Sequence, residues 1–243
     1  MRAVTAVMKR ELYNYFATPT AYVVILAFLV MAGVFTFYLG HFFDKAQADL
    51  SAFFQYLPWL YLFFLPAVAM GLWAPERQLG TLELLMTLPL GIRATVLGKF
   101  FAAWLLSAIA LLMTFPLVVT VNYLGEPDNG VIIGAYIGSL LLASVYLAIG
   151  GAMSAITRNP VIAFILTLVV CFIFMASGVP VVLDSVAMLP QTVQDFVAGM
   201  SLLTHFDAIS RGVLDLRDIS YFVVVSGFWL FVTQWLVQRH KTA

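Results

Sequence analysis

The chain has 243 residues, of which 63% are hydrophobic and 10% charged, and its 12 basic and 12 acidic residues give a net charge of zero. Soluble domains carry about 25% charged residues, so this composition excludes a water-facing globular protein. The balanced charge gives no support to nucleic-acid binding. The single cysteine, Cys171, lies in an apolar run and cannot form a disulfide within the chain.

Residues 2–17 are predicted to form an amphipathic helix that lies in the membrane interface, because apolar residues recur at three- and four-residue spacing opposite a basic face. Pro19 is expected to end this helix. Glu11 falls near the centre of the apolar stripe, where a carboxylate needs a partner, such as a basic residue of the next cytoplasmic loop. The alternative is that the helix lies shallow in the membrane interface, so that the carboxylate of Glu11 reaches water.

Six strongly apolar stretches follow, each of about 17–25 residues and long enough to cross a hydrocarbon core of about 30 Å as a helix. The predicted transmembrane helices are 20–39, 54–73, 97–123, 131–156, 161–183 and 219–237. Prolines at 58, 66, 116 and 180 are expected to kink them. Residues 1–243 therefore read as a single all-α membrane domain.

Basic residues are distributed unequally between the two sides of these spans. Nine of the twelve fall on the side of the termini, and only Lys45, Arg211 and Arg217 fall on the other. The positive-inside rule then places both termini in the cytoplasm of a multi-pass protein of the bacterial inner membrane. Within the spans, Gly134, Gly138, Gly150 and Ser154 offer faces for close packing, and contacts within the chain explain them at least as well as dimerisation.

Catalytic, cofactor-binding and metal-binding residues are not predicted. The three histidines, His41, His205 and His240, lie at or beyond the ends of spans, which disfavours haem ligation and a zinc site within the bundle. The run 91–100 lacks the glycine spacing and the preceding strand of a phosphate-binding loop. The protein is therefore expected not to be an enzyme and not to bind ATP itself.

The cytoplasmic loop 74–96 is predicted to contain two short helices. Pro75 suits a first helical turn with Glu76 near its positive end, Gly80 interrupts, and Thr81 caps a second helix that carries Glu83 and ends at Pro89. A short helix at the cytoplasmic edge of the bundle is suited to docking on another protein. A loop that only covers the end of the bundle explains the pattern equally well.

The external segment 184–218 is predicted to form short helices that dip back toward the membrane. Asp207 and Arg211 stand four residues apart and suit an ion pair on one helix face. The alternative is a solvated cap without a gating role.

Three runs of the sequence form a recognisable set in their order along the chain. They are Lys9-Arg10-Glu11-Leu12, Glu76-Arg77-x-x-Gly80-Thr81-x-Glu83-x-Leu85-x-x-x-Pro89 and His205-Phe206-x-x-Ile209-Ser210-Arg211-Gly212-x-Leu214-Asp215-Leu216-Arg217-Asp218. Together they resemble the type-2 ABC exporter permeases, and the closest subgroup is the gliding-motility-associated permeases. The resemblance covers essentially the whole chain. One departure is Ala74-Pro75, where an acidic residue is expected before Glu76.

The resemblance implies a half-transporter that pairs in the bilayer with a second copy or a related permease, each bound to a cytoplasmic ABC ATPase that holds the ATP. It makes 2–17 an elbow helix, 74–96 a coupling loop and 184–218 an external re-entrant gate. The implied ATPase-coupling residues are Glu11, Glu76, Arg77, Gly80, Thr81, Glu83 and Pro89, and the implied gate residues are Asp207, Arg211 and Gly212.

The spans contain few polar residues to line a path, so the expected substrate of export is apolar or lipid-linked. The alternative is a mechanotransmitting scaffold that passes ATPase movements to periplasmic or membrane partners while nothing crosses. A membrane-anchored periplasmic accessory subunit is compatible with either reading.

Overall fold

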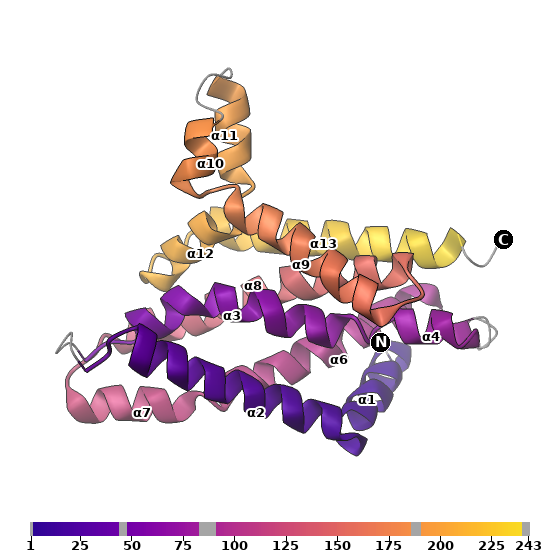
Figure 1. Ribbon diagram of the computed structural model, residues 1–243, viewed down its shortest axis with the longest axis horizontal. Helices are drawn as coiled ribbons and strands as arrows, with labels where there is room; N and C mark the ends of the chain where they lie inside the picture. The colour runs from indigo at the N-terminus through magenta and orange to yellow at the C-terminus, as the bar shows by residue number, and fades with distance from the viewer. Residues whose placement is uncertain (1, 44–47, 83–90, 186–190, 240–243) are drawn as a thin grey trace.

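The computed structural model describes residues 2–43, 48–82, 91–185 and 191–239, and regular secondary structure in these ranges is entirely helical. Most of the long helices run side by side along one direction (Figure 1). Helix α1 (Arg2–Ala17) has the bounds predicted for the elbow, and it meets α2 (Pro19–Val34) at an angle. The change of direction occurs at Thr18, whose backbone is extended, just before Pro19 in the first turn of α2.

The next elements contain the predicted proline breaks. Helix α2 continues into the π-helical turn η1 (Phe35–Leu39), and α3 (Ser51–Ala69) contains both Pro58 and Pro66. A turn then leads into the short α4 (Ala74–Gln78). The predicted span 97–123 is divided into α6 (Ile92–Leu112) and α7 (Phe115–Leu124), because Pro116 begins a new helix after the turn at Thr114.

Helix α8 (Asn129–Ile156) is the centre of the bundle, and α3, α6, α9, α12 and α13 all contact it. Its small residues permit these contacts. A Cβ at Gly150 would lie 2.3 Å from the Cβ of Ala69, and one at Gly138 would lie 2.7 Å from Cγ2 of Ile209. At these two glycines, therefore, packing within one chain accounts for the small residues.

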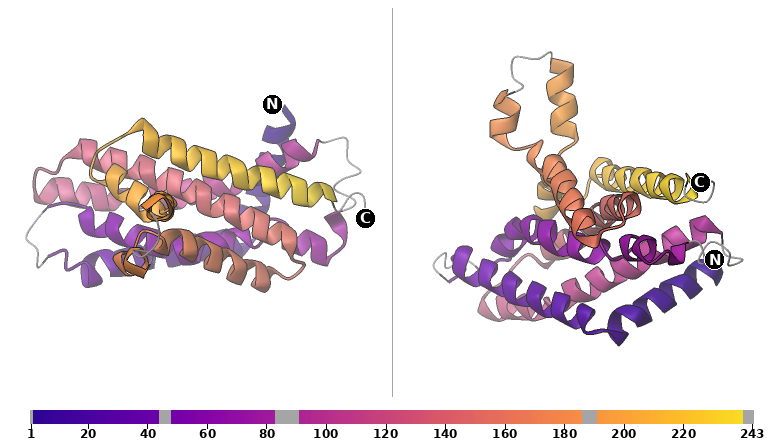
Figure 2. Two further views of the ribbon diagram at one scale, coloured as in Figure 1. Left: turned by 90° about the horizontal axis from the view of Figure 1, so that it is seen from above. Right: turned by 45° about the vertical axis from the view of Figure 1, so that its right-hand side comes forward.

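The predicted fifth span is shorter than expected. Helix α9 (Pro160–Ala176) ends seven residues before position 183, and a turn at Gly178 leads into α10 (Pro180–Ser185). Helices α10 and α11 (Gln191–Gly199) lie beside each other and project away from the bundle (Figures 1 and 2). Helix α12 (Leu202–Ser210) returns to α8, and α13 (Leu216–Arg239) runs along α8 to the end of the described chain. Of α10, α11 and α12, it is α12 that packs against the bundle.

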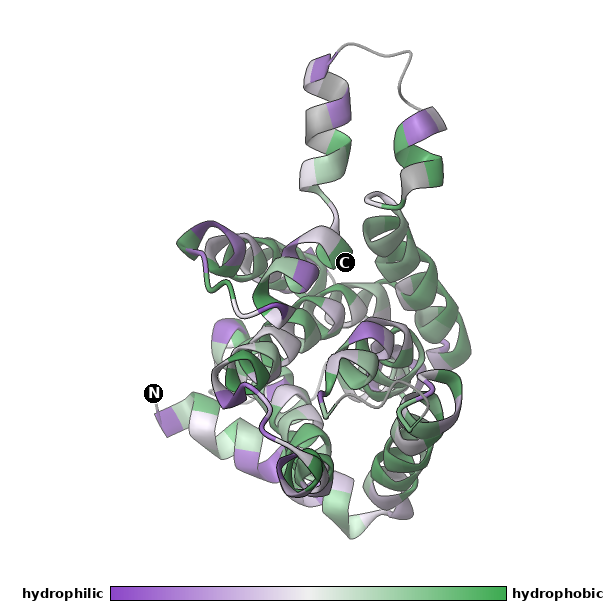
Figure 3. Ribbon diagram, turned by 90° about the vertical axis from the view of Figure 1, so that its left-hand side faces the viewer, coloured by the Kyte–Doolittle hydropathy of each residue, from purple (hydrophilic) through white to green (hydrophobic). Residues whose placement is uncertain are grey.

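Five described helical stretches are long and apolar enough to cross a membrane, and α9 is a shorter apolar helix of 17 residues. Hydrophobic residues dominate the long helices on their outer faces as well as inside (Figure 3). This distribution is that of a bundle surrounded by lipid.

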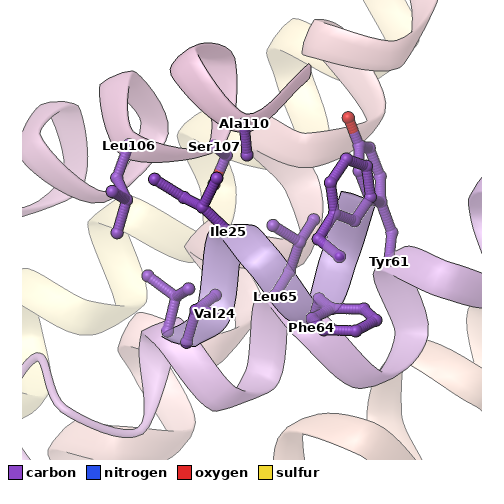
Figure 4. A pocket seen from close by; sticks show the side chains of 10 residues that line it. Val24, Ile25, Tyr61, Phe64, Leu65, Leu106, Ser107 and Ala110 are labelled. Carbon is purple, nitrogen blue, oxygen red and sulfur yellow. The ribbon is translucent and has the colours of Figure 1, made fainter. Parts of the chain in front are cut away.

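A small apolar cavity lies where α2, α3 and α6 meet (Figure 4). Its volume of about 20 Å³ is room for about one water molecule. The side chains around it include Val24, Phe28, Tyr61 and Leu106. This cavity is too small to hold a substrate.

Candidate functional site

A buried lysine joins three helices at the end of the bundle that carries α4. Lys99, near the start of α6, is 2% exposed. Its Nζ lies 2.8 Å from Oε1 of Glu76 in α4 and 3.6 Å from Oε1 of Glu11 in α1. The same ammonium group donates a hydrogen bond to the carbonyl of Leu72 at 2.8 Å. Lys99 therefore connects the elbow, the turn after α3, and α6.

The charges at this junction compensate one another. Lys99 faces two carboxylates, and Arg10 donates to Oε1 of Glu11 at 2.6 Å. The Nζ of Lys99 also lies 5.1 Å from the ring centre of Trp73, a distance suited to a cation–π interaction. Burial, with Glu11 and Glu76 nearby, raises the pKa of Tyr15 above its ordinary value. We call Glu11, Glu76 and Lys99 the elbow junction.

A buried hydroxyl fixes the bend between α3 and α4. Oγ of Ser154, near the end of α8, accepts hydrogen bonds from the backbone N–H groups of Trp73 and Ala74, each at 3.0 Å, and donates to the carbonyl of Met70 at 3.0 Å. Arg77 donates to the carbonyl of Ala155, one of the carbonyls left without a helical partner at the end of α8. Helix α4 is thus attached to the central helix at both of its ends.

The segment after α4 turns outward at a residue with left-handed backbone. Gly80 has φ of 70° and open space where a Cβ would stand. Gln78, Leu79 and Thr81 are exposed, and Leu79 is 75% exposed although it is apolar. Residues 78–81 therefore form an exposed tip, which we call the α4 tip.

Gly80→Ala is expected to cost about 1–2 kcal/mol in the free energy of unfolding, because only glycine takes the left-handed conformation without a steric penalty. Gly91→Ala is the matched control: Gly91 also has open space around it, but its φ is −64°. Denaturant unfolding of both variants in detergent measures the difference. Equal stabilities would contradict a role for the positive φ.

The structure assigns the predicted coupling residues to different surroundings. Glu11, Glu76 and Arg77 make contacts within the chain, whereas Gly80 and Thr81 lie on the α4 tip. The predicted pairing of Glu11 with a basic residue is confirmed, but neither partner lies in the loop 74–96: the partners are Arg10 at 2.6 Å in the same helix and Lys99 at 3.6 Å in α6. Glu83 and Pro89 lie outside the described residues, as does most of the second predicted loop helix.

At the opposite end of the bundle, a buried histidine joins α12 to α13. Nδ1 of His205 lies 2.6 Å from Oδ1 of Asp218, and Nε2 lies 3.2 Å from the carbonyl of Gly199. The imidazole stacks on Tyr221 with ring centres 4.0 Å apart, and the Tyr221 hydroxyl donates to the carbonyl of Met200. These contacts fix α12 and the end of α11 to the first turns of α13.

The predicted ion pair between Asp207 and Arg211 is wrong, because within the described residues no contact of 4.0 Å or less joins them. Helix α12 ends at Ser210, and the backbone N–H of its C-cap, Arg211, still donates to the carbonyl of Asp207 at 3.2 Å. The two residues therefore lie one helical turn apart, but their charged ends do not meet. Both still line a cavity of about 450 Å³ beside the end of α9. Partial burial raises the pKa of Asp207 above its ordinary value, and Arg211 opposes that rise.

Gly212, the third predicted gate residue, follows directly with φ of 88°. A Cβ there would lie 2.9 Å from Cγ2 of Val131. Its position thus requires both the left-handed backbone and the absence of a side chain, and it turns the chain closely past α8.

Sequence reasoning missed Lys99, Ser154 and the His205–Asp218 pair. The sequence does contain a sign that Lys99 is paired, because position 99 falls inside the predicted span 97–123 and a charged side chain within a span needs a partner. Ser154 was recognised only as a small residue, and its partners are 80 and 81 positions away. The histidine pair had no local signal, since neither residue type nor spacing predicts the contact.

A family model described as ABC-2 family transporter protein matches residues 5–233. The match includes the elbow, the α3–α4 bend, the external helices and most of α13. A search of curated proteins gives no match.

Proposed function

Because the chain belongs to the ABC-2 family of transporter membrane proteins, we propose that it is the permease subunit of an ATP-driven exporter and receives movement from a separate ATPase. The observation that carries this proposal is the elbow junction, where Lys99 holds Glu11 of α1 and Glu76 of α4 together on α6. A segment attached in this way moves with the bundle instead of sliding over it. It is suited to transmit a force applied at its exposed tip.

The proposed topology has six crossings, with α9 as the fifth. A helix of 17 residues spans about 25 Å, at the lower limit for a transmembrane helix. With α1 as the interfacial elbow and the charge asymmetry of the loops, both termini face the cytoplasm of a bacterial inner membrane. The gliding-motility-associated permeases remain the proposed subgroup, on the motifs at Glu76 and His205.

The α4 tip, placed on the cytoplasmic side in the proposed topology, is the proposed contact for the ATPase. Leu79 offers an exposed apolar side chain, and Gly80 and Thr81 present backbone and hydroxyl beside it. In the described chain, Oε2 of Glu76 is buried and accepts no hydrogen bond. A buried acceptor without a partner is costly, so a donor from the docked subunit would complete this site.

Movement of α4 would reach the centre of the bundle directly. Ser154 and Ala155, at the end of α8, hold α4 through three hydrogen bonds from Trp73, Ala74 and Arg77. The other end of α8 contacts α12 and the turn at Gly212. Helix α8 therefore connects the proposed ATPase contact with the proposed external gate residues Asp207, Arg211 and Gly212.

The partners follow from this arrangement. A second copy or a related permease would complete the transporter, the ATPase would hold the ATP, and this chain would carry no cofactor of its own. The two larger cavities, of about 340 and 450 Å³, lie at the end of the bundle near Arg211, and the one where α2, α3 and α6 meet holds only about 20 Å³, so we propose that an exported substrate passes between subunits. The same observation favours the alternative, in which the subunit transmits movement to periplasmic or membrane partners and transports nothing.

The proposal is tested by purification from native membranes of the wild type and of Leu79→Asp, with mass spectrometry of the partners and an ATPase assay. An ATPase is expected with the wild type, and Leu79→Asp is expected to reduce its yield about tenfold, as the loss of an apolar anchor does. Leu214→Asp is the matched control, because Leu214 is 50% exposed at the opposite end of the bundle.

A wild-type protein that purifies without an ATPase would end the transporter assignment. If the ATPase is present, ATP-driven uptake of apolar or lipid-linked compounds into inside-out vesicles separates the two functions. Uptake supports export, and a complete absence of uptake with intact ATPase coupling supports the mechanotransmitting scaffold.

A further inference from the structure

A second cavity lies at the external end of the bundle, on the other side of Arg211 from the one beside α9. Its volume is about 340 Å³, and it lies between the start of α3, the connection from α7 to α8, and the end of α12. This size falls in the range of small-molecule sites, about 300–1,000 Å³. Its lining includes three charged side chains, Asp49, Asp128 and Arg211.

The lining of this cavity changes from charged to apolar. Asp128 and Arg211 are exposed, whereas Leu50, Phe54 and Ile132 are only 2%, 4% and 6% exposed. Phe54 belongs to α3 and Ile132 to α8, two of the membrane-spanning helices. The charged side chains thus lie on the solvent side of the cavity, and its apolar part is continuous with the bundle.

The charged groups keep unused hydrogen-bonding capacity. Oδ1 of Asp49 accepts from the backbone and hydroxyl of Ser51, and Oδ1 of Asp128 accepts from two backbone N–H groups at the start of α8. Within the described chain, the second oxygen of each carboxylate and the guanidinium of Arg211 make no hydrogen bond. Two carboxylate oxygens that can accept hydrogen bonds and one guanidinium group that can donate them are therefore available to a ligand.

We propose that this cavity binds the headgroup of a zwitterionic aminophospholipid. The primary ammonium group of the ligand donates to Asp49 and Asp128, its phosphate accepts from Arg211, and its glycerol end lies over Leu50, Phe54 and Ile132. Two carboxylates and one guanidinium match a headgroup that carries both charges, and the apolar part of the cavity matches the start of the acyl chains. The site does not depend on the proposed transport function.

Binding is tested with the purified full-length protein by native mass spectrometry, titrating phosphatidylethanolamine, phosphatidylcholine and phosphatidylglycerol with identical acyl chains. Phosphatidylethanolamine is expected to bind about tenfold more tightly than either, because the quaternary ammonium of phosphatidylcholine has no N–H to donate and phosphatidylglycerol has no cation. Equal affinity for the three lipids would overturn the proposal.

Two variants locate the site. Asp128→Asn keeps an N-cap residue of the same quality for α8, and Arg211→Gln removes the cationic fork. Each is expected to weaken phosphatidylethanolamine binding about tenfold, while Arg217→Gln, an exposed arginine that does not line the cavity, leaves binding unchanged. Unchanged binding in both site variants would overturn the location. Phosphoethanolamine that binds as tightly without acyl chains would overturn the assignment to a lipid.

Discussion

Lys99→Met is expected to lower the free energy of unfolding by about 3–5 kcal/mol, the usual cost of removing one partner from a buried ion pair. The reason is geometric. The Nζ of Lys99 is the cation 2.8 Å from Glu76 and 3.6 Å from Glu11, and methionine fills similar volume without charge. Two carboxylates would then face each other in a site where Lys99 itself is 2% exposed. Denaturant unfolding in detergent, followed by tryptophan fluorescence, measures the loss.

The triple variant Lys99→Met, Glu11→Gln, Glu76→Gln is the control for this interpretation. Removing the carboxylate charges together with the ammonium is expected to restore most of the stability, because a neutral replacement of a whole buried charge cluster costs little. A triple variant as unstable as Lys99→Met would show that the lysine acts through its packing. In that case the elbow junction would not be an electrostatic connection.

His205→Ala is expected to destabilise α12 and the start of α13 by about 1–3 kcal/mol, the usual cost of leaving a buried polar group without its partner. The two imidazole nitrogens face Oδ1 of Asp218 and the carbonyl of Gly199. Removal of the ring leaves the buried carboxyl group of Asp218, which is 8% exposed, without this partner. Hydrogen exchange of α12 and the start of α13 is expected to increase more than that of α3.

The double variant His205→Ala, Asp218→Asn separates charge from packing. Neutralising Asp218 is expected to recover a large part of the loss, and the coupling energy from the double-mutant cycle measures the pair. Independent, additive effects of the two substitutions would contradict an interacting buried pair. Stacking on Tyr221 would then be the main contribution of the imidazole.

The local sequence predicted the elements whose bounds depend on the length of an apolar stretch and on helix breaks at proline. A helix was predicted at 2–17 and lies at Arg2–Ala17, and the fourth span was predicted at 131–156 and coincides with the apolar helix α8, Asn129–Ile156. Pro116 was expected to kink the third span, and it begins a separate helix. Apolar length and proline geometry are local properties, so they are readable without a fold.

The errors arose where the chain leaves the membrane. Apolar residues continue to 183, but α9 ends at Ala176, because the turn at Gly178 packs against Ser201 and a new helix starts at Pro180. The Asp207–Arg211 pair was predicted from spacing alone; the two residues do lie one helical turn apart, but in the described chain no contact of 4.0 Å or less joins their charged groups. The end of α9 depends on its contact with Ser201, and the ion pair depends on side-chain conformation; hydropathy and spacing contain neither.

The candidate site was predicted only in part from the sequence, because the rest of it depends on tertiary contacts that a local motif does not contain. The residues of the loop after α3 were recognised by their motif, but their division into an attached group and an exposed group follows only from tertiary contacts. Glu76 and Arg77 hold α4 on the bundle, and Leu79 lies on the exposed tip without having been singled out. Which side of a short helix faces the bundle is decided by Lys99 and Ser154, both distant in sequence.

Site-specific photocrosslinking from position 79 in native membranes tests most directly whether the α4 tip contacts an ATPase. The photoreactive group is attached to Leu79→Cys, because the natural Cys171 is buried, and Leu214→Cys is the control. The expected result is a single major product that joins position 79 to a soluble ATPase subunit and is absent from position 214. No product from position 79, or the same product from both positions, would contradict the coupling role of the tip.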